Sequence, residues 1–194
     1  MIRIAILASG SGTNAQRLME HFRMHPAAEV ALVGCDRPRA GVVQRAWDMD
    51  VPCYLFKGSD LSDGTVQREL EGANIDLVVL AGFMRLLPPD FVHAWPERIL
   101  NIHPSLLPKF GGKGMYGDRV HNAVLEAGEK ESGITIHLVN ERYDEGRVLE
   151  QVKCVVLPDD DAAALAERIH ALEHAHYPTT VETFVNSLPM GTVD

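Results

Sequence analysis

Three polar side chains in the second half of the chain are of types that could together carry a proton transfer. Asn101 and His103 are separated by one residue in an apolar run that predicts a strand, so their side chains fall on the same face. Pro104 ends that run, which places both at the carboxyl end of the strand, where open α/β sheets bind ligands. Asp144 stands in a polar loop between two later strands. An amide, an imidazole and a carboxylate suit acyl-type transfer to an amine, because the first two stabilise an oxyanion and the third assists proton movement.

A second candidate site is the glycine-rich loop that follows the first apolar run. Residues 4–8 are wholly apolar, residues 9–14 read Ser-Gly-Ser-Gly-Thr-Asn, and a helical stretch follows from about residue 15 to 23. This order is typical of anion binding at a helix N-terminus, where glycines admit the anion to unpaired N–H groups. With Ala15 the spacing also fits a dinucleotide fingerprint, in which Asp36 would contact a ribose. A tight turn without a ligand is the alternative.

The apolar runs along the chain predict the elements that hold these residues in place. Over the first hundred residues short apolar runs, such as 4–8 and 76–81, alternate with helical stretches, which is typical of βαβ units and a mostly parallel sheet. Residues 134–139 and 148–156 follow one another across a loop, which predicts an antiparallel pair. The acidic residues 159–161 open a terminal helix, because carboxylates complement the helix dipole. The sequence therefore predicts a single α/β domain with a Rossmann-like sheet, helices on both faces and an antiparallel C-terminal strand pair.

Composition and charge exclude several classes of protein. The chain has 194 residues, of which 46% are hydrophobic and 23% charged, as in an average soluble domain. Its 18 Lys and Arg against 27 Asp and Glu give a net charge of −9, which argues against a nucleic-acid partner because phosphate backbones are bound by basic surfaces. The first apolar run is too short for a signal peptide or a membrane span, so we expect no membrane partner. Three widely spaced cysteines, Cys35, Cys53 and Cys154, indicate reduced thiols and a cytoplasmic location.

Four motifs occur in a fixed order along the chain. They are Ser-Gly-Ser-Gly-Thr-Asn at 9–14, Ala-Gly-Phe-Met-Arg-Leu-Leu at 81–87, Asn-Ile-His-Pro-Ser-Leu-Leu-Pro at 101–108 and Tyr-Asp-Glu-Gly at 143–146. In these motifs the chain resembles the phosphoribosylglycinamide formyltransferases, a branch of the folate-dependent formyltransferases, over essentially its whole length. The third motif with the distal aspartate is specific to the wider superfamily. The first motif narrows the resemblance to the glycinamide ribonucleotide branch.

This resemblance implies transfer of the formyl group of 10-formyltetrahydrofolate to the amine of glycinamide ribonucleotide, in de novo purine (IMP) biosynthesis. Asn101, His103 and Asp144 would be catalytic and would act on an oxyanionic tetrahedral intermediate. Asn101 and a protonated His103 would donate hydrogen bonds to the oxyanion, and Asp144 would raise the proton affinity of the imidazole.

The same resemblance assigns the binding residues. The backbone N–H groups of Gly12, Thr13 and Asn14 would hold the 5′-phosphate of the substrate, and Glu173 would meet its ribose hydroxyls. The folate pocket would be formed by Met84, Arg85, Leu87, Val92, Ile99, Asn140, Glu141, Arg142 and Tyr143. The single formyltransferase domain, 1–194, would then consist of a phosphate-binding half at about 1–100 and a catalytic and folate-loop half at about 101–194.

The resemblance also sets expectations about cofactors and partners. The folate would be a co-substrate, with no metal and no nicotinamide, because the amine is itself the nucleophile. The partners would be the two small-molecule substrates, and the chain would be a monomer or a weak homodimer. Residues 111–117 form a glycine-rich stretch that is longer than in many relatives, read either as a lid beside the substrate or as a surface loop. Tyr143 stands where relatives commonly have an aliphatic residue, which would alter the folate packing.

Further interpretations concern the histidines that lie outside the four motifs. His170 and His174 are four residues apart on the predicted terminal helix, with His176 nearby, a spacing that fits a metal site. Glu173 and His174 also fit the pattern of the family, so the metal reading competes with the substrate reading. His121 could approach the site from the loop, but we expect it to be a surface histidine.

Other activities would use the same residues. Formyltetrahydrofolate deformylases and transfer-RNA formyltransferases share the Asn, His and Asp set, but each is expected to carry an additional domain. From a different class, a non-catalytic dinucleotide-binding module would use Gly10, Gly12 and Asp36. That alternative leaves the motif around Asn101 and His103 unexplained.

Overall fold

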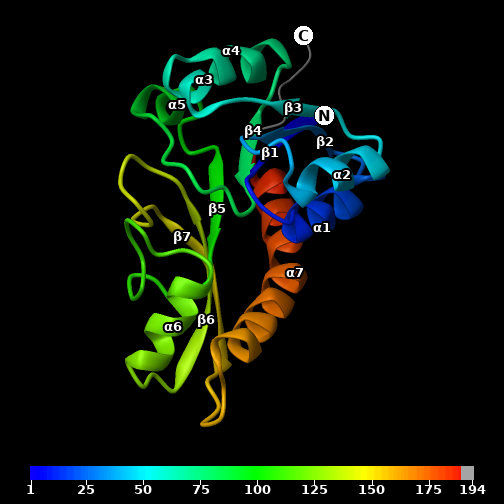
Figure 1. Ribbon diagram of the computed structural model, residues 1–194. Helices are drawn as coiled ribbons and strands as arrows, with labels where there is room; N and C mark the ends of the chain where they lie inside the picture. Colours follow the sequence, from blue (N-terminus) through cyan, green and yellow to red (C-terminus); the bar gives the residue numbers. More distant parts are fainter. Residues whose placement is uncertain (189–194) are drawn as a thin grey trace.

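Apolar strands alternate with amphipathic helices along the chain in the order that the sequence predicts. The computed structural model describes residues 1–188, so the last part of the predicted domain, 189–194, lies outside the described residues (Figure 1). The elements are β1 (Ile2–Ala8), α1 (Thr13–Phe22), β2 (Ala28–Cys35), α2 (Gly41–Asp48), β3 (Cys53–Leu55), α3 (Gly58–Ser62), α4 (Thr65–Gly72), β4 (Leu77–Leu80), α5 (Pro89–Ala94), β5 (Ile99–His103), α6 (Asp118–Glu126), β6 (Glu131–Leu138), β7 (Val148–Val155) and α7 (Ala162–Ser187).

The strands form one mixed sheet in the order β3-β2-β1-β4-β5-β6-β7. The strands β1 to β5 pair in parallel, and β6 pairs antiparallel with both β5 and β7. The predicted antiparallel C-terminal pair is therefore confirmed. In β4 every residue is buried, because a central strand of a parallel sheet is covered on both faces.

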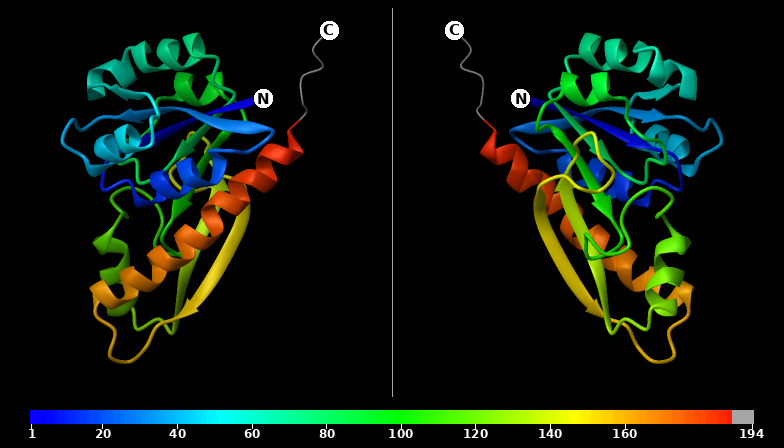
Figure 2. Two further views of the ribbon diagram at one scale, coloured as in Figure 1. Left: turned by 90° about the vertical axis from the view of Figure 1, so that its right-hand side faces the viewer. Right: turned by 90° about the vertical axis from the view of Figure 1, so that its left-hand side faces the viewer.

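Helices cover both faces of the sheet, as predicted (Figures 1 and 2). One apolar core joins α1, α2, α6 and α7 to the sheet, with Leu18, Val42, Val124 and Ile169 among its members. A second core on the other face joins α3, α4 and α5, through residues such as Val66. No helix within residues 1–188 is both long enough and apolar enough to cross a membrane.

Two helical features have local causes that can be read from side-chain contacts. The long helix α7 begins after Asp161, whose carboxylate accepts a hydrogen bond from the N–H of Ala164 at 2.8 Å, as expected for an acidic N-cap. The short helix α3 was not predicted. It is only one turn long, too short to show a helical period, and Asp60 stabilises its start by accepting from the N–H of Lys57 at 2.8 Å.

The strand order reverses direction between β1 and β4, and this point organises the candidate site. The chain adds β2 and β3 on one side of β1 and then crosses to add β4 and β5 on the other. The loops after β1 and β4 therefore meet at the same edge, where the N–H of Ser9 donates to the carbonyl of Gly82 at 3.1 Å and Ser9 Oγ accepts from the N–H of Met84 at 3.1 Å. Ligands of open α/β sheets bind at such a reversal.

Candidate active site

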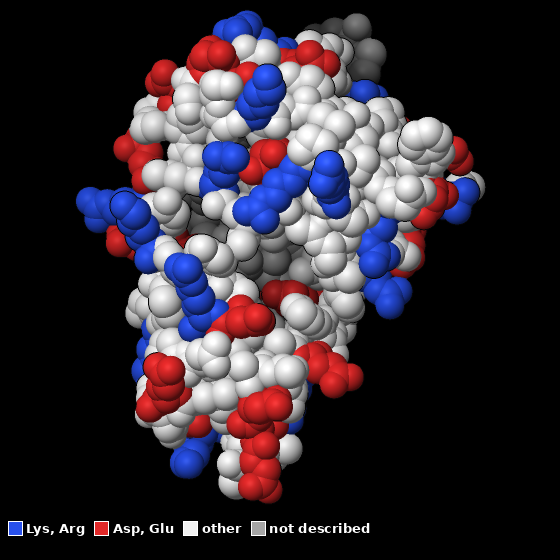
Figure 3. Space-filling view, viewed as in Figure 1, with Lys and Arg blue, Asp and Glu red and all other residues white. Residues whose placement is uncertain are grey.

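A cavity of about 520 Å³ opens at the carboxyl edge of the sheet. Figure 3 shows a hollow in this face of the molecule, with Lys and Arg side chains at its rim. Its walls come from the loops after β1 and β4, the end of β5, residues 112–117, the loop after β6 and the middle of α7. A volume of this size is typical of small-molecule sites. The glycine-rich stretch 111–117 contributes to the wall, so it is not a surface loop remote from the site.

The cavity brings together most of the residues that the sequence singles out. Those on its surface are Gly12, Thr13, Asn14, Met84, Arg85, Leu87, Asn101, His103, Asn140, Arg142, Tyr143, Asp144 and Glu173. They come from strands, loops and helices between Gly12 and Glu173, so their convergence depends on the sheet order and on the packing of α7.

His103 lies at the end of β5 with its side chain only 5% exposed. Its Nε2 is 2.8 Å from the carbonyl oxygen of Phe110, and its Nδ1 is 3.6 Å from Oδ2 of Asp144. Burial lowers the pKa of His103, and the opposing influence of the Asp144 carboxylate does not offset it. The expectation that Asp144 would raise the proton affinity of His103 is correct for that one contact, but the net direction in the free protein is downward.

Asp144 is held by a backbone hydrogen bond and lies beside two histidines. Its Oδ2 accepts a hydrogen bond from the N–H of Gly112 at 2.9 Å, and its Oδ1 lies 3.6 Å from Nε2 of His137. Burial alone would raise the pKa of Asp144, but His137, His103 and the Gly112 N–H together lower it. Asp144 is therefore an anion in the free protein, ready to compensate a positive charge on an imidazole.

Asn101 is oriented by His137, which faces it across the β5–β6 pair. The Nδ1 of His137 donates to the carbonyl of Leu138 at 2.9 Å, so in its neutral form its Nε2 accepts from Nδ2 of Asn101 at 3.2 Å. One amide hydrogen of Asn101 is then left for a ligand in the cavity. His137 was not predicted as a site residue. Its link to the site is its position opposite Asn101 in the paired strands, which no sequence motif shows.

The glycine loop has the geometry of an anion site at a helix N-terminus. Gly12 precedes α1 with a φ of 79°, in the left-handed region, and a Cβ there would lie 2.6 Å from Cα of Val42. Glycine is thus required both for the backbone conformation and for the approach of α2. The first N–H groups of α1, from Thr13 onward, have no partner within the helix and lie at the cavity.

Glu173 of α7 joins this loop to the rest of the cavity. Its Oε2 accepts a hydrogen bond from Nδ2 of Asn14 at 2.8 Å, and the residue is only 6% exposed. Burial raises the pKa of Glu173, and the hydrogen bond from Asn14 only partly opposes this. The Oδ1 atom of Asn14 is buried and makes no hydrogen bond within residues 1–188. The Asn14–Glu173 pair therefore presents both donor and acceptor groups to a hydroxylated ligand.

The prediction that His121 lies on the surface is wrong. His121 is 2% exposed and lines the cavity, because α6 turns this side of the helix toward α7 and the sheet. Its Nδ1 is buried without a hydrogen-bond partner in the described part of the chain, and burial lowers the pKa of the imidazole. The burial of His121 could be predicted in part from the sequence, since Val120 and Val124 mark the apolar side of the same helix.

Three residues proposed for the folate pocket do not reach the cavity. Val92 and Ile99 pack in the apolar core beneath it, because α5 and the start of β5 turn them toward α3 and α4. Glu141 points away from the cavity and pairs with His93 at 2.7 Å. Asp36, considered for a ribose, instead contacts Arg85 at 2.6 Å and is not part of the cavity wall.

The histidines of α7 do not form a recognisable metal site. His170 and His174 stack with ring centroids 6.5 Å apart, and His176 instead contacts Glu150 at 3.0 Å. Within residues 1–188 no group of three or more His, Cys, Asp or Glu side chains has the arrangement needed to hold a metal ion.

The mixed sheet thus carries a glycine loop at its switch point and an Asn, His and Asp set after the neighbouring strands, an arrangement suited to a group-transfer enzyme. The chain belongs to the formyl transferase family, whose sequence pattern matches residues 2–181. Within that family it groups with the phosphoribosylglycinamide formyltransferases, also named glycinamide ribonucleotide transformylases, as its relatives show. The resemblance read from the motifs is thereby confirmed.

Two curated relatives illustrate the similarity in sequence. The chloroplastic phosphoribosylglycinamide formyltransferase of Arabidopsis thaliana is 40% identical over 186 residues, which cover 92% of this chain and 64% of the relative. The trifunctional purine biosynthetic protein adenosine-3 of Drosophila melanogaster is 41% identical over 194 residues, covering 95% of this chain and 14% of that protein. The chain thus spans less than two thirds of the length of either relative.

Solved structures of similar proteins match over most of their length. Glycinamide ribonucleotide transformylase 1 from Geobacillus kaustophilus has a TM-score of 0.87 and 40% identity, covering 95% of this chain and 99% of that one. The corresponding protein from Symbiobacterium toebii has a TM-score of 0.89 and 37% identity, covering 98% of this chain and 92% of that one. These likenesses extend the family membership from sequence to the whole fold.

Proposed function

We propose that this chain transfers the formyl group of 10-formyltetrahydrofolate to the amine of glycinamide ribonucleotide, in de novo purine biosynthesis. The observation that carries the proposal is the convergence of Asn101, His103 and Asp144 in the same cavity as the glycine loop. One end of that cavity offers N–H groups to a phosphate, and the other offers an amide, an imidazole and a carboxylate to a reacting carbonyl.

In the proposed reaction the substrate amine attacks the formyl carbon, and the carbonyl oxygen takes up negative charge. The free amide hydrogen of Asn101 donates to this oxyanion. The proton released by the amine passes to Nδ1 of His103, because Nε2 already donates its hydrogen to Phe110. The imidazolium then formed is stabilised by Asp144 at 3.6 Å and returns the proton to the folate nitrogen as its bond to the formyl carbon breaks.

The substrate nucleotide takes the part of the cavity between α1 and α7. We assign its 5′-phosphate to the N–H groups of Gly12, Thr13 and Asn14, since neutral donors at a helix N-terminus bind an anion without a basic surface. Glu173 meets the ribose hydroxyls. Its position supports this role, because the side chain lines the cavity and is held beside the glycine loop by the hydrogen bond from Asn14.

The folate co-substrate takes the remaining walls of the cavity. Met84, Arg85 and Leu87 line it on the side of β4, and the loop with Asn140, Arg142, Tyr143 and Asp144 covers it from the side of β6. Val92 and Ile99 support this pocket from the core. The division into a phosphate-binding half, about 1–100, and a catalytic and folate-loop half, about 101–194, follows from these assignments, with Glu173 of the second half reaching the nucleotide.

We further propose a cytoplasmic enzyme that acts on these two small molecules as a monomer or a weak homodimer, without a metal, a nicotinamide, a nucleic acid or a membrane. The three cysteines support a reducing compartment, because all of them are free thiols. The acidic balance of the chain supports small-molecule partners over polyanions.

An assay of purified protein with 10-formyltetrahydrofolate tests the proposed reaction. We expect tetrahydrofolate to form only when glycinamide ribonucleotide is present, in equal amount to the formylated nucleotide. Equal tetrahydrofolate formation with and without the nucleotide would indicate a deformylase and contradict the proposal. A thermal-shift comparison completes the test, because stabilisation by NAD and not by the nucleotide would favour a dinucleotide-binding module.

A further inference from the structure

Asp36 has no part in the reaction proposed above, yet its carboxylate is almost fully buried. It follows β2 directly, and its side chain is 1% exposed. Removing a carboxylate from water is costly, so a buried carboxylate needs a partner that compensates its charge. The identity of that partner indicates what Asp36 does.

The partner of Asp36 is Arg85, from the loop after β4. The Nε of Arg85 donates to Oδ2 of Asp36 at 2.6 Å, while the arginine side chain is 45% exposed and lines the cavity. The other oxygen of Asp36, Oδ1, is buried and makes no hydrogen bond within residues 1–188. Within these residues the carboxylate of Asp36 therefore accepts a side-chain hydrogen bond from Arg85 alone.

The contact leaves the binding end of Arg85 free. A guanidinium group has five N–H donors, and the bond through Nε uses one while both terminal amino groups stay available. Gly58 leaves room for the group on its other side: a Cβ at that position would lie 2.5 Å from Nη1 of Arg85 and 2.9 Å from Cζ. Asp36 and Gly58 together orient the fork of Arg85.

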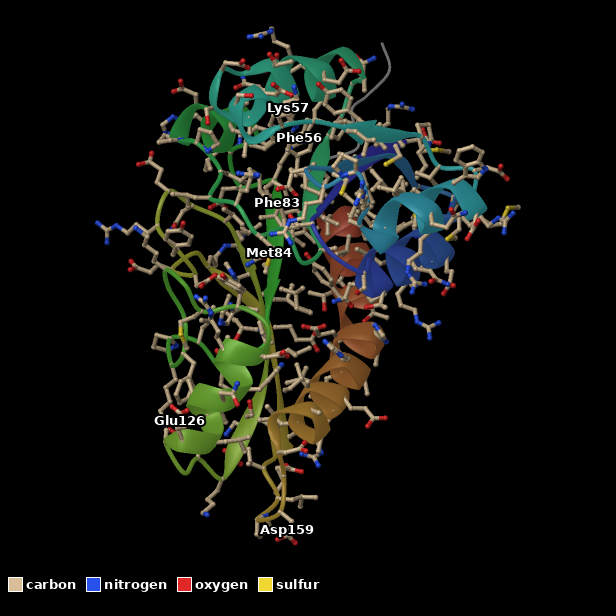
Figure 4. The ribbon with its side chains drawn as sticks, in the orientation of Figure 1. Phe56, Lys57, Phe83, Met84, Glu126 and Asp159 are labelled. Atoms are coloured by element: carbon tan, nitrogen blue, oxygen red, sulfur yellow. The ribbon has the colours of Figure 1, made fainter. Side chains whose placement is uncertain are left out.

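This fork lies at the edge of the cavity that is far from the reaction centre. Arg85 follows β4 and reaches toward Asp36 and Gly58, which follow β2 and β3 on the far side of β1, whereas Asn101 and His103 lie on β5, on the other side of β4. Figure 4 shows Phe56 and Lys57, which lead from β3 into α3, above Phe83 and Met84, and the rings of Phe56 and Phe83 are 6.1 Å apart. A long ligand that reacts near His103 would extend along the loop after β4 toward Arg85.

A folate has the matching chemistry. Its one-carbon group is carried in the middle of the molecule, and its far end is a glutamate with two carboxylates. An arginine with two free terminal amino groups binds a carboxylate in bidentate fashion. Lys57, next to Gly58, makes no ion pair within the described residues and adds positive charge at the same edge.

We propose that Asp36 is a positioning residue that aims the terminal amino groups of Arg85 at the glutamate carboxylates of the folate co-substrate, with Gly58 leaving room for the guanidinium. The inference rests on the proposed function, because it requires a folate with a glutamate tail. Asp36 itself touches no substrate. By holding the Arg85 side chain in place beforehand, Asp36 reduces the conformational entropy that the arginine loses when the folate binds.

Three variants and one control separate this role from a structural one. Asp36→Ala removes the acceptor, Asp36→Asn keeps an oxygen for the Nε hydrogen but removes the charge, and Gly58→Ala displaces the guanidinium without altering Asp36. Gly72→Ala is the matched control, because it makes the same change in α4 at a position where the new Cβ meets nothing within 4 Å.

The measurement is the dissociation constant of two stable analogues, determined by calorimetry. One is 10-formylfolic acid, and the other is 10-formylpteroic acid, which lacks the glutamate. We expect Asp36→Ala and Gly58→Ala to weaken binding of the first about three- to tenfold, the cost of immobilising one long side chain. Binding of the second, and the KM for glycinamide ribonucleotide, should stay unchanged. Asp36→Asn should fall between wild type and Asp36→Ala, and Gly72→Ala should match wild type.

Several outcomes would overturn the inference. Equal weakening of both analogues would show a structural role, and unchanged binding in both Asp36→Ala and Gly58→Ala would show no role. If Asp36→Ala fails to fold, the selectivity of Gly58→Ala decides alone. A wild-type protein that transfers formyl groups but binds both analogues equally refutes only this inference, whereas one that binds neither analogue and transfers no formyl group refutes the proposed function as well.

Discussion

The carbonyl oxygen of Phe110 lies 2.8 Å from Nε2 of His103 and thereby fixes where this histidine can take up a proton. A carbonyl only accepts, so Nε2 carries the hydrogen and the lone pair of the neutral ring is on Nδ1. That atom faces Asp144 at 3.6 Å. The carbonyl of Phe110 points this way from a residue with a φ of 55°, in the left-handed region. The backbone just before the glycine-rich stretch therefore helps to set the protonation chemistry of the site.

We expect His103→Ala and Asp144→Ala to abolish turnover while both substrates still bind. The imidazole accepts the proton of the amine and the carboxylate stabilises the resulting charge, whereas the phosphate and the folate are held by other residues. Steady-state kinetics with calorimetry of each substrate would check this, with His21→Ala as a control outside the cavity. Near-wild-type turnover by either variant would reject the catalytic assignment.

The pH dependence of the reaction should reflect the lowered pKa of His103. Because the neutral imidazole acts as the base, activity is lost as the pH falls through a pKa below the ordinary value of 6.5. In Asp144→Asn the carboxylate that raises this pKa is gone, so the residual activity should persist to still lower pH. Profiles of kcat/KM against pH for both proteins provide the measurement. A wild-type acid limb centred above 6.5 would contradict the prediction.

Removing the amide of Asn101 should lower kcat on the order of 10²–10³-fold with little change in either KM, since the donor acts on the oxyanion. The control is Asn122→Ala, an exposed asparagine on α6. His137→Ala should lower kcat by less, because His137 touches no reacting atom and acts chiefly by orienting Asn101. The double variant should be no worse than Asn101→Ala, and fully additive losses would show that His137 acts independently.

Gly12→Ala should raise the KM for glycinamide ribonucleotide at least tenfold, because the new Cβ would push the loop away from Val42. Any residue other than glycine is also strained at this φ of 79°. Gly64→Ala is a matched control, since Gly64 also precedes a helix, with a φ of 77°, but lies outside the cavity. It should lower stability by about 1 kcal/mol without changing the KM. Equal KM values for the two variants would argue against a phosphate site.

Stability should fall as the pH drops below about 6.5. Burial lowers the pKa values of His103, His121 and His174 in the folded state, so the unfolded chain binds more protons in acid. Their contribution is complete above the unfolded value of 6.5 and is lost as the pH falls toward the folded values. Urea unfolding at a series of pH values would measure this loss. It should be smaller in His121→Leu, and a steeper loss in that variant would show that His121 does not titrate as described.

Much of the fold could be read from local patterns. Apolar runs such as 4–8 and 76–81 predict buried strands because a strand covered on both faces has no polar side. The acidic residues before α7 predict its start because an N-cap acts over one helical turn. The helix α3 was not predicted because one turn has no period; it is stabilised by the contact of Asp60 at its start and by the burial of Leu61 in the core.

Site residues were predicted where one short segment contains the reactive side chains. They were missed where two distant segments come together only in the folded chain. Asn101 with His103, and the glycine loop, each lie within one motif. His137 acquires its position only from the pairing of β6 with β5, and His121 only from the packing of α6 against the sheet. Val92 and Ile99 lie in the core below the cavity and not in its wall, because an apolar residue is as suited to the one position as to the other.

By itself the sequence determined the family, the order of strands and helices, and the residue types that do the chemistry, because these depend on spacing within short segments. Only the tertiary structure decided which groups face each other across the cavity. The buried Asp36 contacts Arg85 instead of a ribose, and burial lowers the pKa of His103 although a carboxylate lies nearby. The physical reason is that burial and distance are properties of the packed sheet, to which residues from distant parts of the chain contribute together.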